Sequence, residues 1–127
     1  MHNLDIIHRD IKPGNIMVVT GLPLGSEQSI KVFDFGIAKY TGRDNGEIQA
    51  LTATGEIFGS PLYMSPEQCM GKEVDVRSDI YSLGCVMFEA LTGRTPIAGE
   101  NALQTVFMHI NAPPLMLNQA GPGLTHP

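Results

Sequence analysis

The chain has 127 residues, enough for one domain, and 43% of them are hydrophobic, so it can bury a core and need not be disordered. Thirteen acidic against eight scattered basic residues give a net charge of −5, which argues against a nucleic-acid partner or an anionic membrane surface. Two cysteines are too few for a disulfide framework or zinc site. Without a signal peptide or a bilayer-spanning apolar stretch, we expect a cytoplasmic protein with no membrane segment.

The first motif in the chain is the polar stretch 8–15, His-Arg-Asp-Ile-Lys-Pro-Gly-Asn, which precedes an apolar run at 16–19. Its proline and glycine disfavour a helix, so the sequence predicts a loop. Such a loop can turn the carboxylate of Asp10, the ammonium of Lys12 and the amide of Asn15 toward one point. A proton acceptor, a phosphate partner and a magnesium ligand together suit phosphoryl transfer. On this motif alone, a polar surface turn is the alternative.

The next motif is a second short strand at 30–33, Ile-Lys-Val-Phe, which continues into Asp-Phe-Gly at 34–36. Between the two strands, residues 20–29 are rich in Gly, Pro and Ser and predict the loop of a β-hairpin. This hairpin would bring Asn15 and Asp34 together. Their side-chain oxygen atoms are the hard ligands that Mg²⁺ prefers.

A long connection follows at 37–59, with little apolar periodicity and with Thr52 and Thr54 in its second half. A connection of this length is usually a functional lid or a disordered segment. It ends at the stretch 59–67, which reads Gly-Ser-Pro-Leu-Tyr-Met-Ser-Pro-Glu.

The clearest helix is predicted over 78–91, where Ser78 or Asp79 can cap the start and Gly93 follows the end. Apolar side chains occupy most of its faces, so we expect it to be buried nearly all round, with Cys85 as a buried free thiol.

A second helix is expected from Asn101 to about Ile110. The proline- and glycine-bearing tail at 112–127 is expected to be loop-like.

Taken in order, these motifs resemble the catalytic half of a protein kinase. The stretch 8–15 matches H-R-D-x-x-x-x-N, 34–36 is D-F-G, and 65–67 is Ser-Pro-Glu in place of A-P-E. Residues 79–84, Asp-Ile-Tyr-Ser-Leu-Gly, resemble the family's D-x-W-S-x-G. The resemblance spans about residues 2–117 and indicates a Hanks-type serine/threonine kinase, as a fragment from the catalytic loop to the middle of the C-terminal lobe.

The resemblance implies an α+β fold: a partial C-terminal lobe, mostly helical, with a short β-hairpin that carries the catalytic loop and D-F-G. Residues 1–127 would then form one partial kinase domain. Its catalytic loop would be 8–15, its activation loop 37–59, its substrate-facing loop 59–67 and its central helix 78–91. An ordinary mobile loop is the alternative for 37–59, but the motifs on both sides favour the activation loop.

The resemblance also assigns catalytic and cofactor-binding roles. Asp10 would accept or orient the proton of the substrate hydroxyl, and Lys12, typical of serine/threonine kinases at this place, would neutralise the transferring phosphate. Asn15 and Asp34 would hold the Mg²⁺ that accompanies ATP. Two apolar residues, for which a plain core role is the alternative, would line the adenine side: Met17 and Phe33.

Further residues would regulate or support the site. Arg9 could pair with phosphorylated Thr52 or Thr54 and so order the activation loop. Ser60 would present its hydroxyl to the catalytic loop, and Asp79 would anchor the backbone of that loop. His8 is expected to be a packed scaffold residue rather than an acid–base group.

Several of the family's parts have no counterpart in the sequence. No glycine-rich loop or V-A-I-K lysine occurs, so we expect the small lobe that covers ATP, and also the last helices, to be missing. One of those helices carries the arginine that pairs with the glutamate at Glu67, and Arg77 or Arg94 could replace it.

Two classes of function remain. The first is a serine/threonine protein kinase, present as a fragment that is inactive alone; its partners would be ATP, a protein substrate with Ser or Thr, and the small lobe of the full-length chain. The second is a non-catalytic remnant that acts as a binding or scaffold module. The intact set Asp10, Lys12, Asn15 and Asp34 favours descent from an active enzyme.

Overall fold

The computed structural model describes residues 7–23, 25–33 and 60–120. The D-F-G motif at 34–36 and the predicted activation loop at 37–59, with Thr52 and Thr54, lie outside the described residues. The described elements, in chain order, are η2 (Pro13–Asn15), β1 (Ile16–Val18), β2 (Ile30–Val32), η4 (Pro61–Tyr63), α2 (Pro66–Cys69), α3 (Val76–Thr92), α4 (Ala102–Asn111) and α5 (Leu117–Ala120), where η marks a turn of 3-10 helix.

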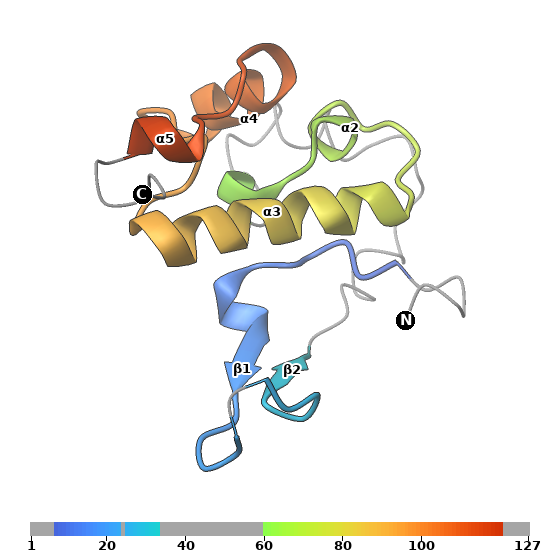
Figure 1. Ribbon diagram of the computed structural model, residues 1–127. Coiled ribbons are helices and arrows are strands. Elements are labelled where there is room, and N and C mark those ends of the chain that lie inside the picture. The colour runs from blue at the N-terminus through green and yellow to red at the C-terminus, as the bar shows by residue number, and fades with distance from the viewer. Residues whose placement is uncertain (1–6, 24, 34–59, 121–127) are drawn as a thin grey trace.

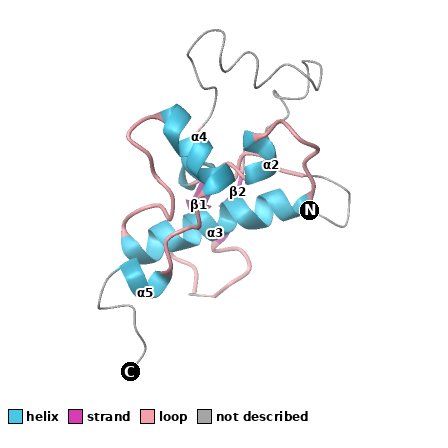
Figure 2. Cartoon of the chain, turned by 90° about the horizontal axis from the view of Figure 1, so that it is seen from above, coloured by secondary structure: helices cyan, strands magenta, loops and turns pink. Residues whose placement is uncertain are grey.

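Helix α3 runs through the middle of the structure (Figure 1), and the other elements lie on either side of it. The β1–β2 hairpin extends from one side, whereas α2, α4 and α5 lie on the other. Seen from above, α5 lies beside the carboxyl end of α3 and α2 lies near its amino end (Figure 2). The loop that precedes β1 therefore passes along α3 before the chain enters the hairpin.

The predicted start of this helix was wrong by two residues. Helix α3 begins at Val76, and its cap is Asp75, whose carboxylate accepts the backbone N–H of Arg77 at 2.8 Å. The proposed caps, Ser78 and Asp79, lie inside the first turns. The helix ends at Gly93, which adopts the left-handed conformation (φ 75°) that glycine tolerates best.

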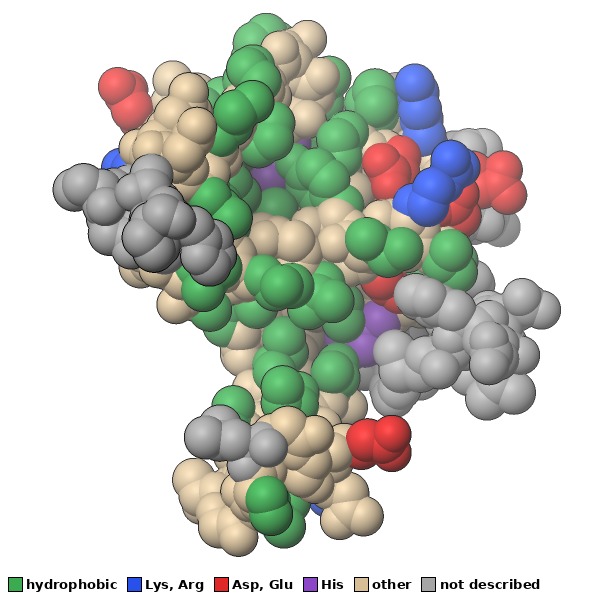
Figure 3. Space-filling view, viewed as in Figure 1, with side chains coloured by type: hydrophobic (Ala, Val, Ile, Leu, Met, Phe, Trp, Pro, Cys, Tyr) green, Lys and Arg blue, Asp and Glu red, His purple; other side chains and the backbone are tan. Residues whose placement is uncertain are grey.

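The prediction that this helix is buried nearly all round was also wrong for the described part of the chain. Its buried stripe includes three polar residues, Ser78, Asp79 and Ser82. Apolar side chains on its other faces are 45–60% exposed, and Figure 3 shows hydrophobic side chains gathered over the middle of the molecule. The polar stripe can be buried because its groups find partners in other segments. The exposed apolar residues are Ile80, Leu83, Met87 and Leu91.

The two cysteines are buried free thiols, as predicted for Cys85. Burial raises the pKa of the Cys85 thiol to about 11. Burial, followed by the nearby charge of Glu67, raises the pKa of the Cys69 thiol to about 11. Both side chains therefore behave as small apolar residues of the interior.

The predicted hairpin is confirmed. Strands β1 and β2 pair antiparallel, with Ile16 opposite Val32, and the connection closes with a bond from Val19 N–H to Ser29 O at 2.8 Å. Phe33 lies just beyond β2, yet its N–H donates to Asn15 O at 3.0 Å. The pairing thus continues to the end of the catalytic loop.

The second predicted helix is confirmed as α4, which Asn101 caps by accepting Gln104 N–H at 2.8 Å. Its His109 is buried and its Nδ1 lies 2.8 Å from the hydroxyl of Tyr81 on α3. Burial lowers the pKa of His109, so the ring favours its neutral form. Helix α4 also packs against η4 and α2, so it supports the segment around Ser60.

The tail is not entirely loop-like, because it contains the short helix α5. Arg94 donates to Ala120 O at 3.0 Å, and Met116 N–H donates to the side chain of Gln119 at 3.1 Å. These bonds satisfy polar groups at both ends of the turn. Within the described ranges, no helix has the length and apolar character needed to cross a membrane.

Candidate active site

The backbone at the start of the predicted catalytic loop is held by Asp79. One carboxylate oxygen accepts His8 N–H and the other accepts Arg9 N–H, each at 2.9 Å. Arg9 has φ 63°, a left-handed conformation that costs a non-glycine residue on the order of 1–3 kcal/mol. Asp79 is 6% exposed, so its bonds to the loop operate away from bulk water.

His8 is buried and ties the loop to the hairpin. Its Nδ1 accepts the N–H of Asp10 at 3.3 Å, and its Nε2 lies 3.2 Å from Phe33 O. Because Nδ1 accepts, the ring proton lies on Nε2, which can then donate to the carbonyl. This geometry suits a packed, neutral scaffold histidine.

The structure brings Asp10, Lys12 and Asn15 together. One oxygen of Asp10, Oδ2, lies 2.9 Å from the ammonium of Lys12 and accepts Asn15 Nδ2 at 3.0 Å. Asn15 Nδ2 also donates to the backbone O of Asp10 at 2.8 Å. The 3-10 turn η2 (Pro13–Asn15) makes this possible, because it folds Asn15 back over the loop.

Asn15 is suited to hold a metal ion. The side chain is 4% exposed, and the bonds described above all use its nitrogen, which fixes the orientation of the amide. The amide oxygen is thus left for another partner, and an oxygen ligand suits Mg²⁺. The second expected ligand, Asp34, lies outside the described residues. Among the residues that are described, no three His, Cys, Asp or Glu side chains group closely enough to hold a metal.

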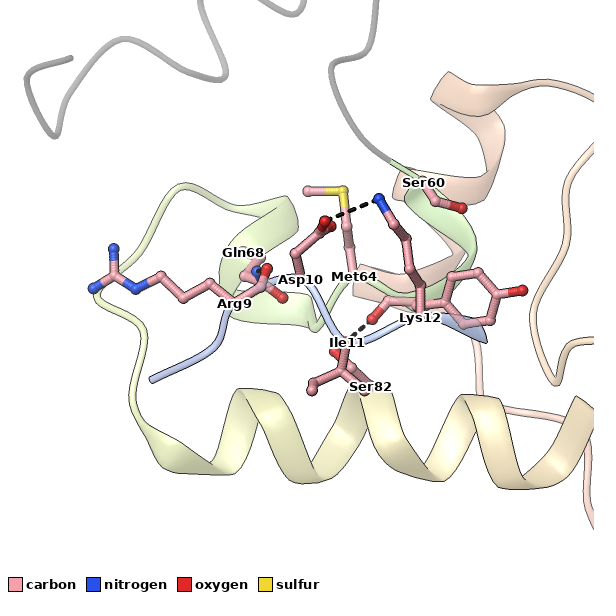
Figure 4. A pocket seen from close by; sticks show the side chains of 9 residues that line it. Arg9, Asp10, Ile11, Lys12, Ser60, Met64, Gln68 and Ser82 are labelled. Atoms are coloured by element: carbon pink, nitrogen blue, oxygen red, sulfur yellow. Dashed lines mark hydrogen bonds and ion pairs between the residues drawn. The ribbon is translucent and has the colours of Figure 1, made fainter. Parts of the chain in front are cut away.

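A shallow open pocket lies over these residues (Figure 4). Ser60 lies beside Lys12, with its hydroxyl turned away from the ammonium. The pocket therefore joins the catalytic loop to the substrate-facing segment predicted after it. Its lining residues are Arg9, Asp10, Ile11, Lys12, Ser60, Tyr63, Met64, Gln68 and Ser82.

Two of the lining residues, which the sequence analysis gave no role, fix the η4 turn. Ser82 on α3 donates to Tyr63 O at 2.7 Å and to Ser78 O at 3.0 Å. The hydroxyl of Tyr63 donates to Glu89, also on α3, at 2.7 Å. Burial, together with this carboxylate, raises the pKa of Tyr63. Tyr63 lies in the predicted substrate-facing stretch 59–67 and Ser82 in the motif at 79–84, so the sequence places both in segments expected to be functional.

Neither of the two arginines suggested as substitute partners for Glu67 pairs with it within the described residues. Arg77 pairs with Asp75 at 2.7 Å, and Arg94 is occupied at α5. Glu67 instead accepts the hydroxyl of Ser78. Burial raises the pKa of this carboxyl, but the bonds from Ser78, from its own backbone and from Ser65 outweigh burial and hold it below its ordinary value.

Met17 and Phe33 lie on one face of the hairpin. The register puts Met17 opposite Lys31, and continuing it puts Phe33 opposite Asn15. Since side chains alternate along a strand, Met17 and Lys31 share a face, and Phe33, two positions after Lys31, continues that face just beyond β2. Met17 and Phe33 are both about half exposed, so their apolar surfaces are open to a ligand.

The chain is similar to known protein kinases. The profile of the family described as "Protein kinase domain" matches residues 1–121. The chain is 44% identical over 124 residues to the "Probable serine/threonine-protein kinase PknB" of Bifidobacterium longum, covering 97% of this chain and 16% of that protein. It is 40% identical over 124 residues to the "Serine/threonine-protein kinase PknB" of Mycobacterium tuberculosis, covering 98% and 18% respectively. It thus spans less than a fifth of the length of these relatives.

Proposed function

Because the chain belongs to the protein kinase domain family, we propose that it is the catalytic-loop part of a serine/threonine protein kinase. The enzyme transfers the γ-phosphate of ATP to serine and threonine hydroxyls of proteins. The observation that carries this proposal is the convergence of Lys12 and Asn15 on one oxygen of Asp10, within 3.0 Å. A scaffold protein has no need for a carboxylate, an ammonium and an oriented amide at one point.

Each residue of this group has a distinct task. Asp10 accepts the hydrogen bond of the substrate hydroxyl and aligns its oxygen with the phosphate. Lys12, whose ammonium lies 2.9 Å from Asp10, would neutralise part of the charge of the phosphate oxygens. Asn15, through its amide oxygen, and Asp34 would hold Mg²⁺, which would screen the charge of the phosphates when bound.

The remaining residues define the edges of the site. The exposed apolar surfaces of Met17 and Phe33 pack against the adenine ring of ATP. Ser60, at the rim of the pocket, turns its hydroxyl toward Asp10 and Lys12 when a protein substrate is bound. The half-buried Glu67, held by Ser78, supports the segment that carries Ser60.

We also propose the division of the chain. The catalytic loop is 8–15, D-F-G is 34–36, the activation loop is 37–59, and the substrate-facing loop is 59–67, with α3 as the central helix. A longer chain supplies the small lobe and the last helices, which the coverage of the relatives supports. The buried free thiols and the need for ATP fit work in the cytoplasm.

The longer protein should therefore transfer labelled γ-phosphate to itself or to a generic basic protein. Acid hydrolysis of the product should release phosphoserine and phosphothreonine rather than phosphotyrosine, and chelation of Mg²⁺ should abolish transfer. The 127-residue chain assayed alone is expected to be inactive, because positioning of the phosphates is most of the catalysis. A longer protein without transfer would favour the scaffold role.

We further propose that phosphorylation of Thr52 or Thr54 switches the enzyme on, with Arg9 as the receptor. A phosphate brings about −1.5 to −2 charges and strong acceptor oxygens, which a guanidinium binds bidentately. The backbone of Arg9 is fixed by Asp79, so ordering the loop through Arg9 couples it to the catalytic loop.

Replacing both threonines by alanine is expected to lower kcat about tenfold or more, since the ordering charge is lost. Arg9→Ala should cause a similar loss and make the enzyme insensitive to phosphatase. Mass spectrometry of the active enzyme locates the phosphate, and Thr20→Ala, in the hairpin connection, serves as the control. Full activity of the double alanine variant would place the switch elsewhere.

A further inference from the structure

We propose that Gln68 is a positioning residue that sets the direction of Asp10 by holding the carbonyl of the Arg9–Asp10 peptide. Its side-chain Nε2 donates to Arg9 O at 2.9 Å, across 59 positions of sequence. This inference rests on the proposed kinase function, because it concerns the residue proposed to receive the substrate hydroxyl. Figure 4 shows Gln68 on α2, close to Arg9 and Asp10.

The side chain of Gln68 is used at both ends. Its Oε1 accepts the N–H of Ser65 at 3.0 Å, while its backbone N–H donates to Ser65 Oγ at 3.4 Å. This reciprocal pair forms a capping box at the start of α2. Because a backbone N–H can only donate and a carbonyl can only accept, the amide has a single orientation that satisfies Ser65 and Arg9 together.

The cap alone does not account for glutamine at this position. A capping box accepts Glu or Gln at the third helical residue, since either side chain supplies the oxygen that the cap needs. Only the amide also supplies a donor for Arg9 O. The need for glutamine therefore comes from the catalytic loop, not from the short helix that bears it.

The peptide that Gln68 holds is the one that most needs support. Arg9 has φ 63°, and its N–H side is fixed by Asp79 at 2.9 Å. The next peptide joins Arg9 to Asp10. Gln68 donates to its carbonyl, Arg9 O, and its N–H, that of Asp10, donates to His8 Nδ1 at 3.3 Å. Rotation of this peptide would redirect the Asp10 side chain, and a displacement of about 1 Å can cost on the order of a hundredfold in rate.

The same contact links two functional segments. Ser65 is fully buried and belongs to the substrate-facing stretch. The side-chain amide of Gln68 accepts the N–H of Ser65 and donates to Arg9 O in the catalytic loop. A shift of the substrate-facing segment is thereby transmitted to the peptide that precedes Asp10. Gln68 thus keeps the proton acceptor in register with the segment that presents the substrate.

The test compares isosteric variants in the longer, active protein. Gln68→Glu retains the oxygen that accepts Ser65 N–H but replaces the donor to Arg9 O by a second acceptor. Gln68→Met retains the length and loses both bonds. Gln28→Glu, at an exposed site in the hairpin connection, adds the same charge away from the pocket and serves as the control.

At pH 7.5, kcat of Gln68→Glu is expected to fall about ten- to a hundredfold, with the KM for ATP and the melting temperature little changed. Protonation of the introduced carboxyl restores a donor, so the ratio of variant to wild-type kcat should rise as the pH is lowered toward about 5.5. Gln68→Met should lose kcat with no such pH dependence, and the control should match wild type.

Wild-type kcat in Gln68→Glu would overturn the inference, and so would a loss that follows the melting temperature or a ratio that does not change with pH. If Gln68→Glu fails to fold, a folded Gln68→Met with wild-type kcat would overturn it equally. A wild-type protein with no phosphate transfer would instead overturn the proposed function, and this inference with it.

Discussion

Replacing Asp10 by asparagine is expected to lower kcat by about 10²–10⁴-fold, the usual contribution of a positioned proton acceptor. The substitution keeps the shape of the side chain but removes the charge and the acceptor that are proposed to receive the substrate hydroxyl. Lys12 and Asn15 both contact Oδ2, so the amide oxygen of asparagine can take that place and still accept from both.

Single-turnover transfer of labelled phosphate, together with the KM for ATP and a thermal melt, measures this effect. The KM and melting temperature should change little, because Asp10 lies at an open pocket. Asp75→Asn is the matched control, since asparagine caps a helix as well as aspartate does. Retention of more than about a tenth of wild-type kcat would show that Asp10 is not the acceptor.

The second large effect is expected at Asp79, where asparagine should destabilise the protein by about 2–3 kcal/mol and lower kcat as well. One carboxylate oxygen becomes an NH₂ group that faces the N–H of either His8 or Arg9, so a buried donor loses its acceptor. In the orientation with the NH₂ group toward Arg9, the left-handed backbone of Arg9 lacks the bond that holds it.

Urea unfolding of the longer protein gives the free energy, and phosphate transfer gives kcat. Asp75→Asn again serves as the control, because its carboxylate is exposed and lies on the same helix. An unfolding free energy for Asp79→Asn within about 0.5 kcal/mol of wild type would contradict the anchoring role, since surface substitutions fall in that range.

The loop, the hairpin and α4 could be predicted because local chemistry determines them. A proline and a glycine disfavour an α-helix at 8–15, two short apolar strands flank a turn-rich segment, and Asn101 is a favourable cap. The grouping of Asp10, Lys12 and Asn15 followed, since all three belong to one short loop.

The errors concern groups whose partners lie far away in sequence. Asp79 was offered as a possible cap of α3, but Asp75 forms the cap. The contact of Asp79 with the loop about 70 positions earlier was expected only from the kinase resemblance, not from the local pattern. For Glu67, Arg77 or Arg94 was suggested as a substitute partner, but the carboxylate accepts the hydroxyl of Ser78 on α3 instead. The role of Gln68 was missed for the same reason, because only its bond to Ser65 is local.

The burial of α3 shows a different limit. An apolar pattern indicates that a helix can be buried on many faces, but it does not predict which face packs against another segment. Here the stripe of Ser78 and Ser82 faces the loops, because backbone carbonyls and Glu67 accept its hydroxyls. Ile80 and Met87 remain exposed in the described structure.

The left-handed backbone at Arg9 restricts which residues evolution can place there. Glycine would relieve the strain but would give up the guanidinium, and a β-branched residue would be penalised further. An arginine retained at this position in homologous chains thus reflects selection on its side chain, strong enough to outweigh a backbone preference for glycine. Where a homologue carries glycine instead, the loop geometry can persist while the cation has ceased to matter.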